Sequence, residues 1–544
     1  TEYHTDRYIA AMAASDAAGM RSLFGNAPFY RYSGRDLANN FSLLYDVSNT
    51  QYYWSLSDAG VTQFFTETGQ GNGMVHMYDN LDNRTMVDEI AGVKYYIRSD
   101  GSLLPYGFER VEGARYDNRT LFDPDEDDPL PVFSFSVFEN KYALPIGFTT
   151  GRYISRETYD ALSIPQRQEA LMQGALLEEA GIGEVQGIAQ ENAQWKAQGE
   201  VKENAQENMQ EEAQENVHEI VQENPQGIAQ ENAPGEVKEA ELVFSEKNIS
   251  YTARAEDGIE FCRTEDGRVE IVVRDTGAAL YLDAGDSEDL SRCEVSVLFS
   301  GMEYRTLQEE TAGEAGERAN DADDAAEEGN AAKDYENTEP VEIVVTAKRD
   351  GETVSRKKIA YTLPDNPWKT GRSDFLSCCG YTEESLDTVR LKFSREGIYT
   401  FEELALIGQP MEAYPSQARA FREYALEDLD LHELPDSGAT AKITGTVTVP
   451  DARILCLQIP HMRGLQGYVD GEEQTLLQAD TMFCALVLEP GTHEIELRYR
   501  TPGLAAGAWI SLAALILFLL EIAGDSTGLT GKRGVPAGLP RKKA

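Results

Sequence analysis

The sequence predicts an α+β protein that carries a single transmembrane helix near its C-terminus. Three observations lead to this fold class: mixed helix and strand signals before residue 183, alternating apolar and polar runs between residues 241 and 500, and an apolar segment at 503–523. A chain of 544 residues has room for several domains. We expect an N-terminal α/β module, a β-sandwich-like region and a membrane anchor, in this order.

The N-terminal α/β module is expected at residues 1–183. Residues 92–97 and 133–138 are interpreted as strands, the second because apolar and polar side chains alternate in it. Residues 155–180 form a helix candidate, with Pro165 marking a break near its middle. Residues 39–65 are helical or irregular and rich in aromatic side chains.

A repeated segment at residues 184–240 follows this module. The triplet Gln-Glu-Asn begins at positions 190, 206, 214, 222 and 230, always at multiples of eight residues. A period of eight matches neither coiled-coil repeat, and Pro225 and Pro234 interrupt the segment. We therefore predict a disordered or loosely helical spacer.

An all-β region begins at residue 241 and is expected to form a β-sandwich-like domain up to residue 435. Alternating residues occupy four of its segments, and turn residues separate them. These predicted strands are residues 268–273, 293–299, 341–345 and 388–393. An acidic insertion at residues 309–339 interrupts the domain and is expected to be a solvated loop.

A membrane-proximal β unit is expected at residues 436–500. Asp470-Gly471 is a strong hairpin signal, and Pro490-Gly491 indicates a second turn. The strand expected after this turn leads directly into the apolar segment. This unit should therefore lie on the bilayer.

The apolar segment at residues 503–523 contains one charged residue, Glu521, near its end. About 20 helical residues cross a hydrocarbon core of roughly 30 Å. A buried core helix is the alternative, but such a helix is normally shorter and carries a polar stripe. Five Lys and Arg residues follow in the tail at 524–544, against Arg498 and Arg500 on the other side. The positive-inside rule places this tail in the cytoplasm and the bulk of the chain outside.

The N-terminus has no initiator Met, no basic segment and no apolar segment of a signal peptide. An extracytoplasmic region without an export signal predicts further sequence upstream. We therefore interpret the chain as the C-terminal part of a larger membrane protein.

Composition excludes several classes of function. The net charge of −46 argues against nucleic acid as a partner, because a phosphate backbone would be repelled. The six cysteines form no CxxC motif, so we predict buried free thiols and no zinc site. The acidic loop at residues 123–128 lacks the Gly and Glu of an EF-hand, and a solvated loop is the preferred interpretation over a Ca²⁺ site. No metal and no cofactor is predicted.

Motifs of common catalytic sites are missing. The sequence contains no Gly-x-Ser-x-Gly, no His-Glu-x-x-His and no phosphate-binding glycine loop, so no catalytic residue is assigned. The candidates for glycan contacts are Tyr52, Tyr53 and Trp54, whose rings can stack on a sugar. Packing in a core is the alternative, and the usual burial of large aromatic residues favours it.

The tetrapeptide Asp-Asn-Arg-Thr occurs twice, at residues 82–85 and 117–120. Both copies contain a glycosylation sequon. Turn formation by Asp-Asn is the simpler explanation.

Several short segments stand in an order that is typical of one protein family. They are residues 29–31, 39–45, 53–56, 92–97, 139–148, 380–381, 393–401, 469–471 and 491–499, followed by the membrane helix. Together they resemble the YfhO family of bacterial multi-spanning membrane proteins. The sequence departs from this family at residues 460–465, Pro-His-Met-Arg-Gly-Leu, where the family has an aromatic Pro-Tyr and Gly-Trp pattern.

This resemblance implies a membrane-embedded glycosyltransferase of the GT-C type. Such proteins look like enzymes that add sugars to lipoteichoic acid or a related cell-wall polymer from a polyprenyl-phosphate sugar. Their catalytic acid lies in an outer loop near the first membrane helices, and no residue of this chain inherits that role. The implied partners are the lipid bilayer, the polymer and the sugar donor. The alternative is a non-catalytic, membrane-anchored module that binds glycans or acts as a scaffold.

Overall fold

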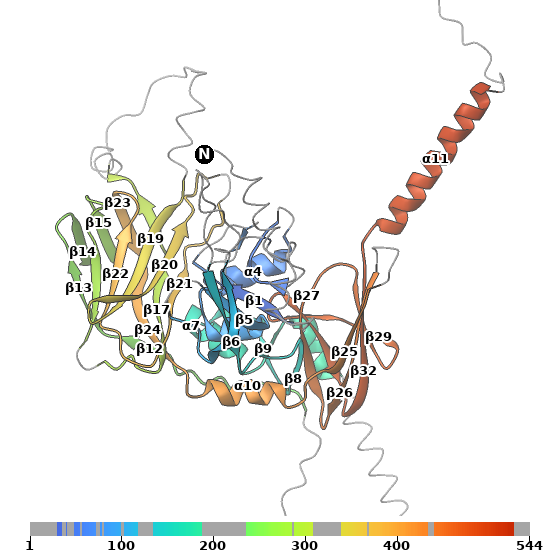
Figure 1. Ribbon diagram of the computed structural model, residues 1–544, viewed down its shortest axis with the longest axis horizontal. Helices are drawn as coiled ribbons and strands as arrows, with labels where there is room; N and C mark the ends of the chain where they lie inside the picture. Colours follow the sequence, from blue (N-terminus) through green and yellow to red (C-terminus); the bar gives the residue numbers. More distant parts are fainter. Residues whose placement is uncertain are drawn as a thin grey trace, which may run out of the picture.

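The computed structural model describes residues 30–34, 40, 48–54, 57–71, 77–78, 81–98, 103–117, 134–187, 236–285, 288–307, 339–366, 369–433 and 440–526. This part of the chain is mostly β, with a few short helices and one long apolar helix, α11 (Leu504–Ser526). Figure 1 shows a sandwich-like part on the left, a central part with short helices, and C-terminal strands on the right, from which α11 departs. Most of the octapeptide repeat, the acidic insertion, the 123–128 loop, the second Asp-Asn-Arg-Thr copy and most of the basic tail lie outside the described residues.

A five-stranded mixed sheet lies in the N-terminal part of the chain. Its strands, in spatial order, are β2 (Ser48–Asn49), β1 (Arg31–Gly34), β5 (Val93–Arg98), β7 (Ser134–Asn140) and β6 (Phe108–Asp117). The strand β1 is parallel to β2 and β5, whereas β7 is antiparallel to β5 and β6. The strands predicted at 92–97 and 133–138 are thereby confirmed.

A seven-stranded sheet combines strands that lie far apart in the sequence. Its strands, in spatial order, are β11 (Lys238–Glu239), β9 (Arg152–Ser155), β10 (Ala175–Leu177), β30 (Leu477–Ala479), β31 (Phe483–Leu488), β27 (Arg453–Pro460) and β8 (Gly147–Thr150). Leu177 pairs with Ala479, and Phe148 pairs with Cys456. Residues before 183 and after 436 therefore share one sheet, which local sequence patterns do not reveal.

The prediction of a helix over residues 155–180 is wrong, because the structure has no continuous helix over this range. Two short helices occupy its first part, α6 (Arg156–Asp160) and α7 (Ile164–Leu171), and the strand β10 occupies its last part. Pro165 lies in the first turn of α7, where its missing N–H costs no helical hydrogen bond. The break therefore precedes Pro165, and the Ser163 N–H donates to Gln166 Oε1 at 3.1 Å to begin α7.

Three antiparallel sheets build the sandwich-like part around one apolar core. One sheet holds β12 (Lys247–Ile249), β24 (Glu403–Pro410), β17 (Cys293–Ser300) and β21 (Phe375–Thr382). The next holds β13 (Tyr251–Ala255), β16 (Leu280–Ala284), β22 (Thr388–Phe393), β19 (Val341–Arg349) and β20 (Glu352–Tyr361). The third holds β14 (Ile259–Arg263), β15 (Val269–Val273), β23 (Gly397–Phe401) and β18 (Glu303–Arg305). All four strands predicted in this region are confirmed.

The last sheet leads into the membrane helix. It holds β25 (Glu427–Glu433), β26 (Thr440–Val449), β32 (Gly491–Arg500), β28 (Leu465–Val469) and β29 (Glu472–Gln474). Asp470 and Gly471 join β28 to β29 with φ values of 53° and 85°, which fits a two-residue hairpin turn. The predicted hairpin is confirmed. The helix α10 (Tyr414–Arg422) lies beside β8, where Phe421 stacks on Phe148 at 5.0 Å.

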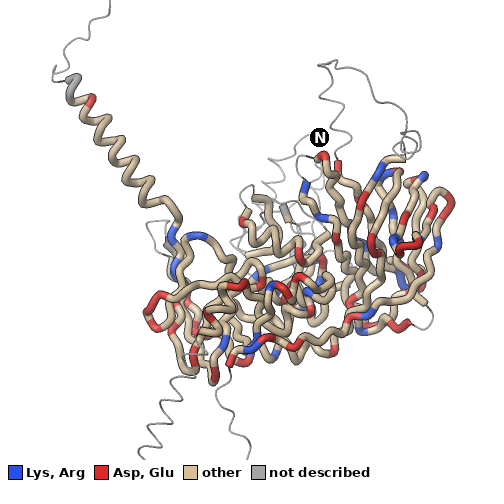
Figure 2. Tube along the Cα trace, turned by 180° about the vertical axis from the view of Figure 1, so that it is seen from behind, with Lys and Arg blue, Asp and Glu red and all other residues tan. Residues whose placement is uncertain are grey.

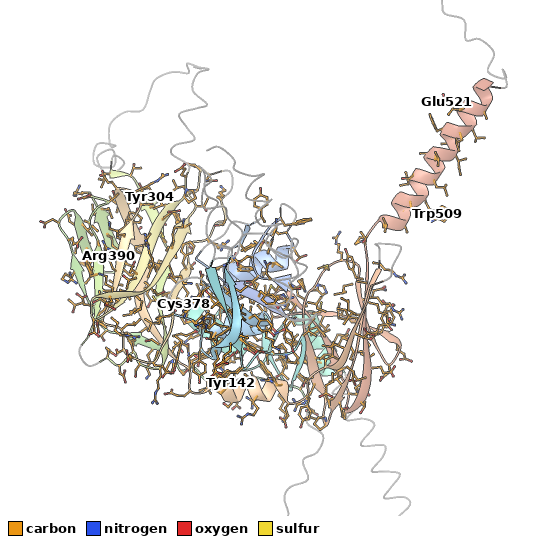
Figure 3. The ribbon with its side chains drawn as sticks, in the orientation of Figure 1. Tyr142, Tyr304, Cys378, Arg390, Trp509 and Glu521 are labelled. Carbon is orange, nitrogen blue, oxygen red and sulfur yellow. The ribbon has the colours of Figure 1, made fainter. Side chains whose placement is uncertain are left out.

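The segment Leu504–Ala523 of α11 is, within the described ranges, the one helix long and apolar enough to cross a membrane. None of it is buried against the rest of the protein. Trp509 lies near the end that adjoins the body and Glu521 near the other end (Figure 3), so the middle of the helix is free of charge. Figure 2 shows that acidic residues are instead spread over the β-rich body.

The cysteines are free thiols in the structure. Five are buried, as predicted, and desolvation by burial is the largest cause that raises the pKa values of all five of these thiols: Cys293, Cys378, Cys379, Cys456 and Cys484. Cys262 is exposed at the surface, so the prediction is wrong for this residue.

Candidate functional site

The predicted aromatic cluster lies on a short strand, β3 (Tyr52–Tyr53), which pairs with β4 (Met77–Tyr78). Because side chains alternate along a strand, Tyr52 and Tyr53 face opposite sides of β3. The Tyr52 ring packs 5.3 Å from the Tyr78 ring, whereas Tyr53 is 48% and Trp54 is 55% exposed. Core packing therefore accounts for Tyr52, and the next two residues present open rings.

The side chain of Asn40 holds the free edge of β3. Its Nδ2 donates to the Tyr53 carbonyl at 3.0 Å, and its Oδ1 accepts from the Tyr53 N–H at 2.9 Å. The amide thus supplies the two hydrogen bonds that a neighbouring strand would supply. This pairing fixes the backbone from which the exposed rings project.

A polar groove of about 440 Å³ has Asp58, four residues after Trp54, in its lining. It lies between the start of α4 (Ala59–Glu67) and the loop that joins β27 to β28. Asp58 caps α4, because its Oδ1 accepts from the Gly60 N–H at 2.8 Å. Side chains of several polar types line the groove: Asp58, His461, Arg463, Gln466, Glu473, Gln474 and Thr475. We call it the membrane-proximal groove.

The aromatic strand and the membrane-proximal groove adjoin each other. Burial raises the pKa of the Tyr52 hydroxyl, and the neighbouring Tyr78 and Asp58 raise it further. Asp58 is therefore close enough to Tyr52 to act on it electrostatically. Trp54 precedes Asp58 by four residues, so the Cα atoms of the two residues are at most about 14 Å apart.

The loop at 461–464 forms one wall of the groove, and it is hydrogen-bonded to Arg500, just before the membrane helix begins. His461 donates its N–H to the Met482 carbonyl at 2.8 Å, and the Arg500 N–H donates to the Gly464 carbonyl at 2.8 Å. Gly464 has a φ of +92°, and a Cβ there would lie 2.1 Å from the Arg500 carbonyl oxygen. Since β32 ends at Arg500 and α11 begins at Leu504, this wall of the groove lies close to the point where α11 leaves the body. Figure 1 shows α11 departing from the C-terminal strands.

The carboxylates of the groove already have partners. Asp58 accepts from the Gly60 N–H, and Glu473 Oε1 accepts from Gln466 Nε2 at 2.8 Å. Within the described ranges, no group of three or more His, Cys, Asp and Glu side chains is arranged to hold a metal ion. Open rings beside amide, carboxylate and imidazole groups suit the binding of a polyhydroxylated ligand rather than acid–base chemistry on it.

Sequence reasoning missed a second polar feature, which we call the buried polar cluster: Arg84, Thr85, Asp88, Glu89 and Glu294. It lies where α5 (Thr85–Ile90) meets β17. Glu294 accepts from both the N–H of Thr85, at 2.9 Å, and its hydroxyl. Glu89 Oε2 accepts from Asn140 Nδ2 at 2.7 Å and from the Tyr414 hydroxyl at 2.5 Å. These hydrogen bonds join the N-terminal part of the chain to the sandwich.

Three carboxyls of this cluster have pKa values above their ordinary range. Burial is the largest cause that raises the pKa values of Glu89 and Glu294 to about 7. Burial, followed by the nearby Glu294, raises the pKa of Asp88 well above its ordinary value. Neither Asp88 oxygen has a hydrogen-bond partner among the described residues. Because all three carboxyls are enclosed, we assign the cluster a structural role.

The first Asp-Asn-Arg-Thr copy, at residues 82–85, contains two residues of this cluster, Arg84 and Thr85, and is the sequence motif that could have indicated it. Asp82 and Asn83 both have a φ of 58°, so the predicted turn is confirmed. The Asn83 amide is buried, donates to the Leu103 carbonyl at 3.1 Å and accepts from the Tyr96 hydroxyl. The sequon at Asn83 is therefore closed to glycosylation in the folded chain.

The fold and the site define a β-rich protein body with a polar groove at the base of a membrane-spanning helix. The chain belongs to the YfhO family: the family described as bacterial membrane protein YfhO matches residues 4–248 and 356–511. The range between these two segments is not matched, and it contains the sandwich strands β13 to β19. The resemblance expected from the short segments is thereby confirmed.

A comparison with solved structures finds the arabinofuranosyltransferase AftD from mycobacteria among its matches. The two chains are 10% identical, with a TM-score of 0.12, over 46% of this chain and 21% of AftD. This chain thus matches about a fifth of the length of that protein, and the likeness carries no argument about function. A comparison with curated proteins finds no match.

Proposed function

We propose that this chain is the extracytoplasmic C-terminal portion of a membrane-embedded glycosyltransferase. The enzyme would add sugars to a cell-envelope polymer such as lipoteichoic acid, with its catalytic membrane part outside this chain. Membership in the YfhO family supports the class of protein. The observation that carries the role of this portion is the exposure of Tyr53 and Trp54, which follow Tyr52, a residue near Asp58 of the membrane-proximal groove.

In this proposal the groove holds the acceptor glycan close to the bilayer. The rings of Tyr53 and Trp54 pack on apolar sugar faces, and Gln466 and Gln474 exchange hydrogen bonds with hydroxyl groups. A polyprenyl-phosphate sugar is confined to the membrane, so an acceptor held at the base of α11 meets its donor at a high effective concentration. A carboxylate base of the membrane part would then take the proton of the attacking acceptor hydroxyl while the donor phosphate leaves the anomeric carbon.

Deletion of the complete gene tests the class of enzyme. We expect the sugar content of the purified wall polymer to fall, and the wild-type gene to restore it. The Trp54→Ala gene should restore it only in part, because one of the two exposed rings is lost. Val243→Ala removes a side chain that is 71% exposed elsewhere, and it should restore the sugar content fully. An unchanged sugar content after deletion would contradict the transferase assignment.

The second candidate is a non-catalytic, membrane-anchored module that binds glycans or acts as a scaffold. The exposed ring of Trp54 supports it, because stacking of a ring on a sugar needs no catalytic base. Binding of the full chain to immobilised cell-wall glycans in neutral detergent separates the two functions. Glycan binding that depends on Trp54, together with normal sugar content in the deletion strain, would establish the scaffold. We expect Trp54→Ala to weaken this binding roughly tenfold, the size of one well-packed aromatic contact.

A further inference from the structure

A second groove lies at α10, on the side of the body away from the departing α11 (Figure 1). Its volume is about 770 Å³, within the usual range of small-molecule sites. The exposed face of α10 forms one wall, and the turn after β7 forms the other. We call it the α10 groove and define it by Lys141, Tyr142, Ser416, Arg419 and Arg422. Figure 3 shows Tyr142 beside α10.

The lining of the α10 groove carries a net positive charge, although the protein as a whole is strongly acidic. Three cations and one carboxylate, Glu423, line it, although the chain carries a net charge of −46. Lys141 forms an ion pair with Glu109, outside the lining. Arg419 forms no ion pair with any carboxylate in the described ranges. Its guanidinium is therefore available to an anionic ligand.

The walls of the α10 groove are fixed relative to each other. Arg422 Nη1 donates to the Lys141 carbonyl at 3.2 Å, and this bond joins α10 to the opposite turn. The Tyr142 N–H donates to Asn140 Oδ1 at 2.9 Å, which sets the conformation of that turn. A groove that is preformed in this way loses little conformational entropy when a ligand binds.

The ring of Tyr142, which also lines the α10 groove, is held in place by two other aromatic rings. The Tyr142 ring stacks on Tyr106 with a centroid distance of 5.8 Å and an interplanar angle of 8°. It also meets Tyr414 edge to face at 5.4 Å, and Tyr414 is fully buried. The ring offers an apolar surface at a fixed position, beside groups that bind anions.

We propose that the α10 groove binds a phosphate ester of a small polyol or sugar. The guanidinium of Arg419 matches a phosphate group with two parallel hydrogen bonds. The carbon skeleton of the ester packs against Tyr142, and the Ser416 hydroxyl lies in the same lining. Glu423 limits the affinity by charge repulsion. This site is separate from the membrane-proximal groove.

Calorimetric titration of the full chain tests this proposal, with the protein in nanodiscs of zwitterionic phosphatidylcholine and glycerol 3-phosphate as the probe. We expect Arg419→Ala to weaken binding by at least about tenfold, because one charge-assisted hydrogen bond alone accounts for a change of that size and the substitution removes two. Glu423→Gln should strengthen binding, because it removes the carboxylate from the lining. Arg305→Ala makes the same change of net charge on β18, where the side chain of Arg305 is 55% exposed, and should leave binding unchanged.

Titrations with inorganic phosphate and with glycerol measure separately how the phosphate group and the carbon skeleton of the ester contribute to binding. Phosphate alone should bind more weakly than the ester, and glycerol alone should not bind. Nanodiscs that contain phosphatidylglycerol should reduce ester binding only if the natural ligand is a lipid headgroup, which would move the proposal from a soluble ester to a lipid. Equal affinities of the wild type and Arg419→Ala, or no ester binding, would overturn the proposal. These outcomes are independent of the sugar content that tests the proposed enzyme.

Discussion

At the scale of single residues, the junction between the N-terminal part and the sandwich depends on protonated carboxyls. Glu294 and Glu89 are fully enclosed, and the pKa of each lies at about 7 because burial disfavours the charged form. Each carboxyl binds its proton more tightly in the folded than in the unfolded chain. Its contribution to stability is therefore complete below the unfolded pKa near 4.5 and is lost as the pH rises through about 7.

The first prediction follows from this sign. For Glu294, the difference between a pKa of about 7 and the ordinary 4.5 corresponds to about 3 kcal/mol of folding free energy. We expect Glu294→Gln to be as stable as the wild type at pH 5 and more stable at pH 8, because the amide cannot ionise. Thermal unfolding of both proteins at the two pH values measures this. The gain at pH 8 should not exceed about 3 kcal/mol.

Glu260→Gln is the matched control, because its side chain is 69% exposed and pairs with Arg274 at the surface. It should leave the pH dependence of unfolding unchanged. If Glu294→Gln unfolds at the wild-type temperature at both pH values, the carboxyl of Glu294 does not hold its proton as the structure indicates.

Single residues also show where sequence patterns stop being informative. The turn at Asp82-Asn83 was predictable, because both residue types tolerate a positive φ. The exposure of Tyr53 and Trp54 was not, because it depends on the pairing of β3 with β4 and on the amide of Asn40. Average burial of aromatic residues describes Tyr52 but not its two neighbours.

At the scale of elements, the loop between β27 and β28 fixes the membrane-proximal groove to the base of α11. Gly464 approaches the Arg500 carbonyl so closely that no Cβ fits, and its φ of +92° disfavours any other residue. Gly471, in the hairpin turn between β28 and β29, also has a positive φ, but nothing lies within 4 Å of the position of a Cβ. A substitution at Gly464 would therefore cause both a steric clash and backbone strain, whereas a substitution at Gly471 would cause backbone strain alone.

The second prediction compares alanine at these positions. Gly471→Ala should cost about 1 kcal/mol of folding free energy, from the strained backbone alone. Gly464→Ala should cost more and should weaken glycan binding, because the loop must move away from Arg500. Thermal unfolding and binding to immobilised glycans measure the two effects. Wild-type glycan binding by Gly464→Ala would show that this loop does not shape the site.

Elements also mark the limit of what local patterns predict. The strands at 269–273 and 293–300 were predictable, because apolar residues line the side of each strand that faces the sandwich core. The strand β10 was not, since it begins only four residues after the end of α7 and its three residues are all buried. Such a short apolar run is compatible with either a helix or a strand until its pairing with β9 and β30 is known.

At the scale of the whole molecule, the seven-stranded sheet ties the start of the described chain to the segment that enters the membrane. The strand β10 pairs with β30, and the core on one side of this sheet includes Phe64 and Phe483, whose rings lie 6.1 Å apart. The N-terminal part and the strands β30 and β31 therefore belong to one folded body, from which α11 departs. The membrane-proximal groove belongs to this body, so it faces the same side of the membrane as the body does.

The third prediction concerns this sidedness. Cys262 is the one exposed cysteine of the six, so a membrane-impermeant maleimide reports on the side of the membrane that the body faces. We expect intact cells to be labelled at Cys262, because the tail at 524–544 carries five Lys and Arg residues and the positive-inside rule places it in the cytoplasm. A Cys262→Ser chain should lose this label, and adding Ala537→Cys in the tail should restore labelling only after the membrane is permeabilised. Labelling of the tail variant in intact cells would place the β-rich body in the cytoplasm, where it could not meet a cell-wall polymer, and would contradict the proposed function together with the topology.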